Sequence, residues 1–237
     1  MIWTEESAAL LWRAYREGTA KQTLADRITP EIKPDARICD AGCGVGALSL
    51  EMAQRGFCVT ALDISPVALG QLPAHARIEA LCEDAEKHEP EAPYDAMVFC
   101  FFGDMPICLR MAARCCTGDM FYISRDYDMH RFSVGQHPVR YSGYRQARDL
   151  LDKMAIPYQA EECALDMGQP FRDREEARRF FMLYSRDDPA MITDTFLESK
   201  LTHTQSSEYP LYLPHMRRCG MVHVQMKDIP QALAGTE

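Results

Sequence analysis

The sequence has no long apolar run and no excess of positive charge. Its longest uninterrupted apolar stretch is Ala96–Phe102, far shorter than the roughly 20 residues of a transmembrane helix. Residues Met1–Glu6 lack the basic start and apolar core of a signal peptide. The 26 Lys and Arg are outnumbered by 35 Asp and Glu, and the formal net charge is −9. We therefore expect a cytoplasmic protein with no membrane association, and a nucleic-acid partner is disfavoured because polyanions normally need a broad basic surface.

The sequence also has no Cys-x-x-Cys pair, although it contains ten cysteines. Cys39, Cys58 and Cys100 lie in apolar runs that predict strands, where a thiol acts as a small buried hydrophobe. A disulfide framework is typical of small secreted chains and not of a core-rich chain of 237 residues. The adjacent Cys115 and Cys116 could bind a soft metal or pack in the core, and we favour packing. We expect the thiols to be reduced.

One glycine-rich junction carries most of the functional information. The apolar run Ala36–Ala41 leads directly into Gly42, Gly44 and Gly46, and Ala47–Ala53 then has the pattern of a helix. Glycine allows backbone conformations and close approaches that a side chain would forbid. A turn of this kind at a helix N-terminus leaves room for a ligand to lie against the main chain. The turn is therefore predicted to bind a ligand.

Two acidic residues beyond this turn indicate the kind of ligand. The run Phe57–Leu62 predicts the next strand and ends at Asp63, which is placed to accept hydrogen bonds from ribose hydroxyls. A third predicted strand, Ala76–Cys82, is followed by Asp84. A carboxylate at that position can reach the amino group of an adenine ring. The pattern favours an adenine nucleoside.

In this order, the pieces resemble the class I S-adenosylmethionine-dependent methyltransferases. That family's acid followed by alternating glycines is matched by Asp40 and the three glycines, and its two later acids are matched by Asp63 and Asp84. The resemblance covers roughly Ile38–Ser124. It implies S-adenosyl-L-methionine as cofactor. The cofactor-binding residues that it implies are Asp40, Gly42, Cys43, Gly44, Gly46, Asp63, Ile64, Asp84, Ala85, Cys100 and Phe101.

A nicotinamide or flavin dinucleotide site is the rival interpretation of the same turn. Its fingerprint is Gly-x-Gly-x-x-Gly, whose third glycine would fall on Ala47, and alanine is tolerated there. The acid that precedes the turn, Asp40, and the segments Asp63–Pro66 and Cys82–Ala85 are the methyltransferase arrangement. We therefore favour methyl transfer over dinucleotide binding.

The fold class predicted is α/β, with a doubly wound, Rossmann-like, mostly parallel sheet of seven strands and helices on both faces. Further strands are expected at Tyr94–Phe102, Asp119–Ser124 and Tyr158–Asp166, and an antiparallel closing strand within Gly220–Lys227. The whole chain is expected to form one domain. Its predicted parts are an N-terminal helical cap (1–34), a cofactor-binding half (35–126) and a substrate half (127–237) with a helical insertion at about 168–208. In the family the cap is commonly a lid, but its aromatic residues could equally pack on the sheet.

The residues that follow the fourth and fifth predicted strands indicate which type of methyl transfer the chain could carry out and whether it uses a metal. Methyl transfer from a sulfonium needs chiefly alignment of the acceptor, and no catalytic triad is visible. The segment Phe101–Asp104 lacks the Pro-Pro motif of enzymes that methylate base or amide nitrogen. Asp104, Asp126 and Asp128 stand where catechol-type O-methyltransferases hold magnesium, but the Asp-Asn pair of those enzymes is absent. We expect no metal site.

A basic segment, Arg125–Arg148, is the predicted substrate-facing element of this acidic chain. Arginine binds carboxylates and phosphates at two points, so the acceptor is expected to be a small molecule that can be anionic. The alternative is a surface run of arginines that pair with neighbouring acids. The substrate-side candidates are Asp104, Arg125, His130, His137 and Arg140. A noncatalytic adenosylmethionine-binding regulatory module and a protein or RNA methyltransferase remain as other interpretations.

Overall fold

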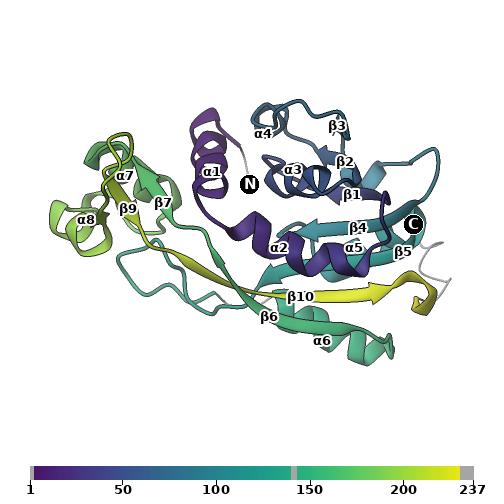
Figure 1. The fold of residues 1–237 in the computed structure, drawn as a ribbon. Coiled ribbons are helices and arrows are strands. Elements are labelled where there is room, and N and C mark those ends of the chain that lie inside the picture. The colour runs from purple at the N-terminus through teal and green to yellow at the C-terminus, as the bar shows by residue number, and fades with distance from the viewer. Residues whose placement is uncertain (1–2, 140–142, 230–237) are drawn as a thin grey trace.

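A seven-stranded sheet forms the centre of the computed structural model, which describes residues 3–139 and 143–229 (Figure 1). The strand order is β3-β2-β1-β4-β5-β10-β6. The first five strands in this order are parallel, and β10 is antiparallel to both of its neighbours. The doubly wound, mostly parallel sheet is therefore confirmed. The strands are β1 (Arg37–Ala41), β2 (Cys58–Asp63), β3 (Ile78–Cys82), β4 (Tyr94–Cys100), β5 (Cys116–Arg125), β6 (Gln159–Asp166) and β10 (Met216–Gln225).

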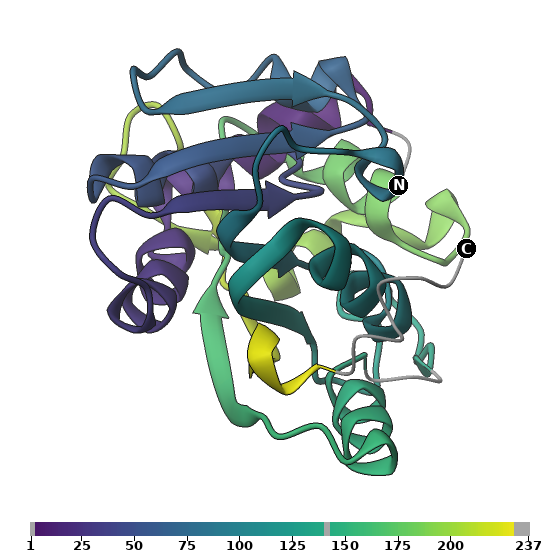
Figure 2. The same ribbon diagram turned by 90° about the vertical axis from the view of Figure 1, so that its right-hand side faces the viewer.

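Helices cover both faces of this sheet (Figures 1 and 2). One face packs against α1 (Glu5–Glu17), α2 (Ala20–Ile28) and α3 (Ala47–Gln54), and the other against α5 (Met105–Cys115) and α6 (Gly143–Met154). Successive residues of a strand point to opposite faces, and the β4 side chains accordingly alternate between the two cores. None of the helices in the described residues combines the length and the apolar character needed to cross a bilayer.

The interval between β6 and β10 folds as a separate layer beside α1 (Figure 1). It contains β7 (Gln169–Phe171), α7 (Arg174–Tyr184), α8 (Asp194–Lys200), β8 (Thr202–His203) and β9 (Leu211–Leu213). The three short strands form their own sheet, in the order β7-β9-β8, which the sequence pattern did not predict. Strands of two or three residues are too short to show a period of two.

One boundary of β4 and one of β10 differ from the prediction for local reasons. The strand β4 ends at Cys100 because Phe101 has a φ of 56° and leaves the extended conformation. Helix α5 begins at Met105, since the Asp104 carboxylate caps it by accepting from the Ile107 amide. Strand β10 begins at Met216, four residues before the predicted start, because the strand continues its pairing with β6. The division into cap, cofactor half and substrate half stays a prediction.

A buried ion pair joins α1 to the inserted layer. The Arg13 guanidinium donates to both carboxylate oxygens of Glu176, at 2.8 and 3.0 Å, and to the carbonyl of Pro170 at 3.1 Å. The two side chains are only 9% and 10% exposed. Burial raises the pKa of Glu176, but hydrogen bonds from Arg13 and the Arg172 amide outweigh it and lower the pKa overall. The contact thus fixes the layer against α1.

We expect Glu176→Ala to lower the free energy of unfolding by about 3–5 kcal/mol, because it leaves the Arg13 charge buried and unpaired. Urea unfolding followed by intrinsic fluorescence measures this change. The control is Glu198→Ala, which removes a partner of the exposed Arg174 at 3.0 Å and should cost less than about 1 kcal/mol. A double Arg13→Leu/Glu176→Leu variant should recover much of the loss. Equal losses in the two alanine variants would contradict the assignment.

Candidate active site

The glycine turn lies at the carboxyl end of β1 and is braced by the end of β2. The amides of Gly42 and Cys43 both donate to the carbonyl of Leu62, at 2.7 and 3.0 Å. The Gly44 amide donates to Oδ2 of Asp63 at 2.8 Å. These amides were expected to face a ligand, but they hold the turn in place. The turn is therefore rigid, and a ligand would contact its surface and the later amides at the start of α3.

Close contacts show why two positions in the turn are glycine. Gly42 and Gly44 have φ values of 69° and 56°, in the left-handed region. A Cβ on Gly42 would lie 2.0 Å from the ring of Phe102, and a Cβ on Gly44 would lie 3.2 Å from the ring of Trp3. Trp3 thus packs directly over the turn. This position, ahead of α1, is where a cover for a bound ligand would lie.

Asp40 is buried beneath the turn with one oxygen unpartnered. Its Oδ2 accepts a hydrogen bond of 2.5 Å from the Ser49 hydroxyl, whereas Oδ1 has no hydrogen-bond partner in the structure. The side chain is 1% exposed. Burial raises the pKa of Asp40 to about 6, against the lowering effect of the Ser49 hydrogen bond. A buried carboxylate oxygen without a partner is costly, so this atom is a place for a cationic or hydrogen-bond-donating group of a ligand.

The predicted ribose and adenine residues line up along the ends of β2 and β3. The Asp63 carboxylate accepts from the amides of Gly44 and Ser65 and is 8% exposed. A carboxylate has about four acceptor positions, so two remain for other donors. Ile64 follows with 70% of its surface exposed. Asp84 is half-buried, accepts from the Glu86 amide and pairs with Lys87 at 3.2 Å.

The exposed side chain of Ile64 is notable for its position. Single exposed apolar side chains are common on protein surfaces, and what distinguishes Ile64 is that it directly follows Asp63 at the end of β2. Ala85, in contrast, is buried behind the loop. The structure therefore brings the predicted cofactor residues to one edge of the sheet, at the carboxyl ends of β1 and β4, between which the strand order reverses. Ligands of open α/β sheets bind at such a point.

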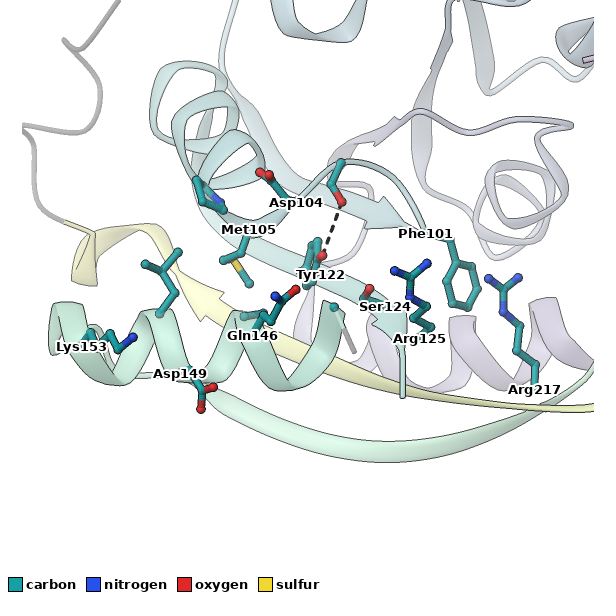
Figure 3. A pocket seen from close by; sticks show the side chains of 15 residues that line it. Phe101, Asp104, Met105, Tyr122, Ser124, Arg125, Gln146, Asp149, Lys153 and Arg217 are labelled. Carbon is teal, nitrogen blue, oxygen red and sulfur yellow. Dashed lines mark hydrogen bonds between the residues drawn. The ribbon is translucent and has the colours of Figure 1, made fainter. Parts of the chain in front are cut away.

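A cavity of about 620 Å³ adjoins this edge, between α5 and α6 (Figure 3). Its volume lies within the usual range for small-molecule sites. It is lined by polar and apolar side chains, and two of the predicted substrate-side residues, Asp104 and Arg125, contribute to it. Asp104 also serves as the helix cap of α5. The described lining residues are Phe101, Gly103, Asp104, Met105, Pro106, Tyr122, Ser124, Arg125, Gly143, Gln146, Ala147, Asp149, Leu150, Lys153 and Arg217.

Phe101 and Arg217 line the cavity and contact each other. The Arg217 guanidinium lies over the Phe101 ring, 3.5 Å from its centroid. Figure 3 shows the Phe101 ring between the side chains of Arg125 and Arg217. A φ of 56° is strained for a bulky residue, and such strain is concentrated at functional sites. The Nε of Arg217 is buried and has no hydrogen-bond partner in the structure.

The two predicted histidines belong to a different cluster. His137 contacts Asp187 at 2.5 Å, and His130 contacts the Ser133 hydroxyl at 2.8 Å. Hydrogen bonds from His137 lower the pKa of Asp187 to about 2. The His137 contact joins the loop after β5 to the segment that follows α7, whereas the His130 contact lies within the loop, and neither histidine lines the cavity. Arg140 lies outside the described residues.

The three acids considered for magnesium are engaged in other contacts. Asp126 is buried and pairs with Arg145 at 2.8 Å, and Asp128 pairs with the same guanidinium at 3.2 Å. Asp104, as described above, caps α5. Within residues 3–139 and 143–229, no group of three or more possible ligands is arranged to hold a metal ion. Part of the basic segment Arg125–Arg148 is therefore a surface run of arginines that pair with neighbouring acids, which is the alternative that the sequence did not exclude.

Sequence reasoning missed Trp3 and Arg217. Trp3 precedes the first predicted helix, and no local pattern connects it with a turn 40 residues away in the chain. Arg217 lies at the start of β10, just before the predicted strand, in the pair Arg217-Arg218. The alternation of that strand, if extended backwards, would have separated the two arginines onto opposite faces.

The comparisons with known proteins agree with this geometry. Residues 38–117 match a family model described as a methyltransferase domain. A magnesium-protoporphyrin O-methyltransferase from Rhodobacter capsulatus is 35% identical over 79 residues, which are 31% of this chain and 35% of that protein. One from Synechocystis sp. is 46% identical over 59 residues, 25% of this chain and 26% of that protein. The matches thus span about a third or less of these relatives.

Among solved structures, the YcgJ protein from Bacillus subtilis has the same fold. It superposes with a TM-score of 0.52 at 14% sequence identity, over 87% of this chain and 97% of that chain. The family match over residues 38–117 includes the glycine turn and the acids that follow it, so this part of the chain is similar to a methyltransferase domain.

Proposed function

We propose that this chain transfers a methyl group from S-adenosyl-L-methionine to a small acceptor that carries an acidic group. The observation that supports this most directly is the position of Phe101 and Phe102. The Phe102 ring covers Gly42 in the turn, while Phe101 lines the cavity. Two consecutive residues at the tip of β4 therefore connect the cofactor edge with the cavity, so an acceptor in the cavity would lie next to the cofactor.

The residues at the cofactor edge suit the proposed cofactor. The orphan Oδ1 of Asp40 would accept from its cationic amino group, and Asp63 has acceptor positions left for its ribose hydroxyls. The exposed Ile64 offers an apolar surface for its adenine ring. When bound, the cofactor supplies an electrophilic methyl group. Trp3, which lies over Gly44, would then cover the bound molecule and limit the access of water.

The acceptor is inferred from the charges at the cavity. Its lining carries three cationic side chains, those of Arg125, Arg217 and Lys153, against the two acids Asp104 and Asp149 (Figure 3). Arg125 and Arg217 lie together beside Phe101, whereas Lys153 lies farther along α6. Guanidinium groups bind carboxylates at two points. None of the described cavity residues is a histidine, and an acceptor that is already ionised at neutral pH needs no general base. A carboxylate meets both conditions, because it can be bound by guanidinium groups and is already ionised at neutral pH.

The role of the protein in this reaction is to position the acceptor. Methyl transfer from a sulfonium is an in-line displacement, for which alignment and the exclusion of water supply most of the rate. Phe101 and Arg217 would orient the acid group toward the cofactor edge. The curated relatives are named magnesium-protoporphyrin O-methyltransferases, so a magnesium porphyrin carboxylic acid is the first acceptor to test. The net charge of −9 disfavours RNA, and we expect the protein to act in the cytoplasm.

The deciding experiment measures transfer of radiolabelled methyl from S-adenosyl-L-methionine to a panel of acceptors. The panel contains magnesium protoporphyrin, simpler carboxylic acids, a catechol and a neutral ester of the porphyrin. We expect label in the acids and none in the ester. Tight cofactor binding with no transfer to any acid would instead favour a noncatalytic binding module. Label in the catechol alone would contradict an acidic acceptor.

Replacing Ile64 by alanine should weaken the binding of S-adenosyl-L-methionine by up to roughly fiftyfold, since about three buried methyl or methylene groups, at about 0.8 kcal/mol each, are lost from the contact. Isothermal titration calorimetry measures the Kd. The side chain is 70% exposed, so the melting temperature should not change. Met182→Ala, at an exposed apolar position on α7, is the matched control and should bind like the parent protein. An unchanged Kd for Ile64→Ala would place the adenine elsewhere.

Cofactor affinity should depend on the ionisation of Asp40. Burial raises the pKa of this carboxyl to about 6, and its ionised form, which prevails above that pH, attracts the cationic cofactor. The Kd should therefore rise as pH falls through 6, approaching about tenfold for each further pH unit. Titrations between pH 5 and 8 test this. In Asp40→Asn the Kd at pH 8 should be higher than in the parent protein and should hardly change with pH. A pH profile parallel to that of the parent protein would show that Asp40 is not the group that titrates.

Removing the Arg217 side chain should affect the acceptor more than the cofactor. For Arg217→Ala we expect the KM of a carboxylate acceptor to rise at least about tenfold, because a charge-assisted hydrogen bond is lost. Arg217→Lys should recover part of this loss, since it keeps the charge but not the planar fork. Steady-state kinetics and cofactor titration separate the effects. Arg174→Ala, at an exposed arginine of α7, should behave like the parent, and an unchanged KM in Arg217→Ala would remove this residue from the acceptor site.

A further inference from the structure

Two cysteines face each other across the antiparallel strands β6 and β10. Cys163 and Cys219 are direct partners in the register of these strands, and their sulfurs are 2.8 Å apart. Opposed residues in antiparallel strands have Cα separations of about 4.5–5.5 Å. Disulfides need Cα separations of about 4.4–6.8 Å. The backbone therefore already holds the pair at a separation suited to a covalent bond, although both thiols are free in the structure.

Four of the other cysteines are arranged differently. The thiols of Cys115 and Cys116 are adjacent in sequence, yet they donate to two separate carbonyls, those of His88 and Asp119. Cys58 and Cys82 are exposed, and their thiols contact Arg77 and the Ile64 carbonyl respectively. Facing thiols are thus a feature of the β6–β10 pair.

The two thiols of the pair are not equivalent. A hydrogen bond from Cys219 lowers the pKa of Cys163, burial opposes this, and the Arg27 guanidinium assists it. The same hydrogen bond and burial raise the pKa of Cys219. Cys163 is also the more accessible of the two, at 8% exposed against 1%, and it lies on β6, the edge strand of the sheet. Edge strands open locally more readily than central ones, so Cys163 is the sulfur that a small reagent would reach first.

We propose that Cys163 and Cys219 are an oxidation site that forms an intrachain disulfide with a small-molecule disulfide as oxidant. The Cys163 thiolate attacks one sulfur of the oxidant, whose other half leaves as a thiolate, and a mixed disulfide results. Cys219 then loses its proton and attacks the Cys163 sulfur, and the second half of the oxidant leaves as a thiolate. The two cysteines lose two electrons and two protons in total, and the oxidant gains the two electrons.

This bond would lie close to Arg217, one of the residues that line the cavity. Cys219 lies two residues after Arg217 on β10, and the 55 residues between the two cysteines include the whole inserted layer. A cross-link that closes a loop of this length removes entropy from the unfolded chain. We expect the oxidised protein to melt roughly 5–15 °C higher than the reduced protein.

The test uses the full-length chain with the two exposed cysteines replaced, Cys58→Ser/Cys82→Ser, to prevent mixed disulfides at these sites. The protein is incubated with oxidised glutathione, its remaining thiols are alkylated in denaturant, and the digest is analysed by mass spectrometry. We expect a cross-linked peptide pair containing Cys163 and Cys219 and a matching loss of two free thiols. Dithiothreitol should reverse both, and the melting temperature should fall back.

Two variants separate this bond from other oxidation products. Cys219→Ser should give only a glutathione adduct at Cys163, without a rise in melting temperature, while Cys115→Ser should form the same cross-link as the parent. Recovery of Cys163 and Cys219 as free thiols, or a stable glutathione adduct on Cys163 with Cys219 still free, would overturn the proposal. The mapping needs no methyltransferase activity, so its result and that of the methyl-transfer assay are separate.

Discussion

The hydrogen bond from the Gly44 amide to Asp63 is the contact on which the cofactor edge depends. It joins the turn after β1 to the end of β2 at 2.8 Å, and it is charge-assisted and buried, which makes it strong. Without it the left-handed turn would have no partner for its central amide. The same carboxylate caps the Ser65 amide at the start of α4 (Pro66–Leu69). One acid thus organises two loops and still has acceptor positions for a nucleoside.

A second constraint is the left-handed residue at the tip of β4. Phe101 has a φ of 56° and its amide bonds to the carbonyl of Ile123 at 2.8 Å, so its conformation is set by β5. The reversal of the chain here sends Phe102 toward the glycine turn and Phe101 toward the cavity and Arg217. The strain of Phe101 is offset by the hydrogen bond of its amide to Ile123 and by the stacking of its ring with Arg217. The cofactor edge and the cavity are therefore parts of one rigid structure.

The inserted layer and β10 bring distant parts of the chain to this structure. The buried pair of Arg13 and Glu176 fixes the layer to α1, and α1 follows the residue that covers the turn, Trp3. Strand β10 leaves the layer and enters the sheet between β5 and β6, which places Arg217 beside Phe101. Stability in one region and the position of the acceptor wall are consequently linked through packed, hydrogen-bonded elements.

The mostly parallel sheet of seven strands could be predicted from sequence because its signals are local, whereas the cofactor-binding residues stay a prediction. An apolar run before Gly42, an acid at Asp63 and a continuous apolar strand at β4 each arise from a few adjacent residues with a physical requirement of their own. The small sheet of β7, β8 and β9 gave no such signal, since strands of two or three residues have no period to detect.

Which side chains line the cavity could be learned only from the tertiary structure. His130 and His137 share a basic segment with Arg125, yet they pair with Ser133 and Asp187 in the loop, and Arg217 enters the cavity from a strand more than 90 residues later. The charged residues of a segment show which groups could bind an acceptor, but the sequence of that segment does not show which of them face the cavity. The sequence alone predicted S-adenosylmethionine as cofactor, since the glycine turn and each of the acids that follow it are marked by a few adjacent residues. Only the pairing of β10 with β5 brings Arg217 to the cavity beside Arg125, because that contact joins residues with no local relation.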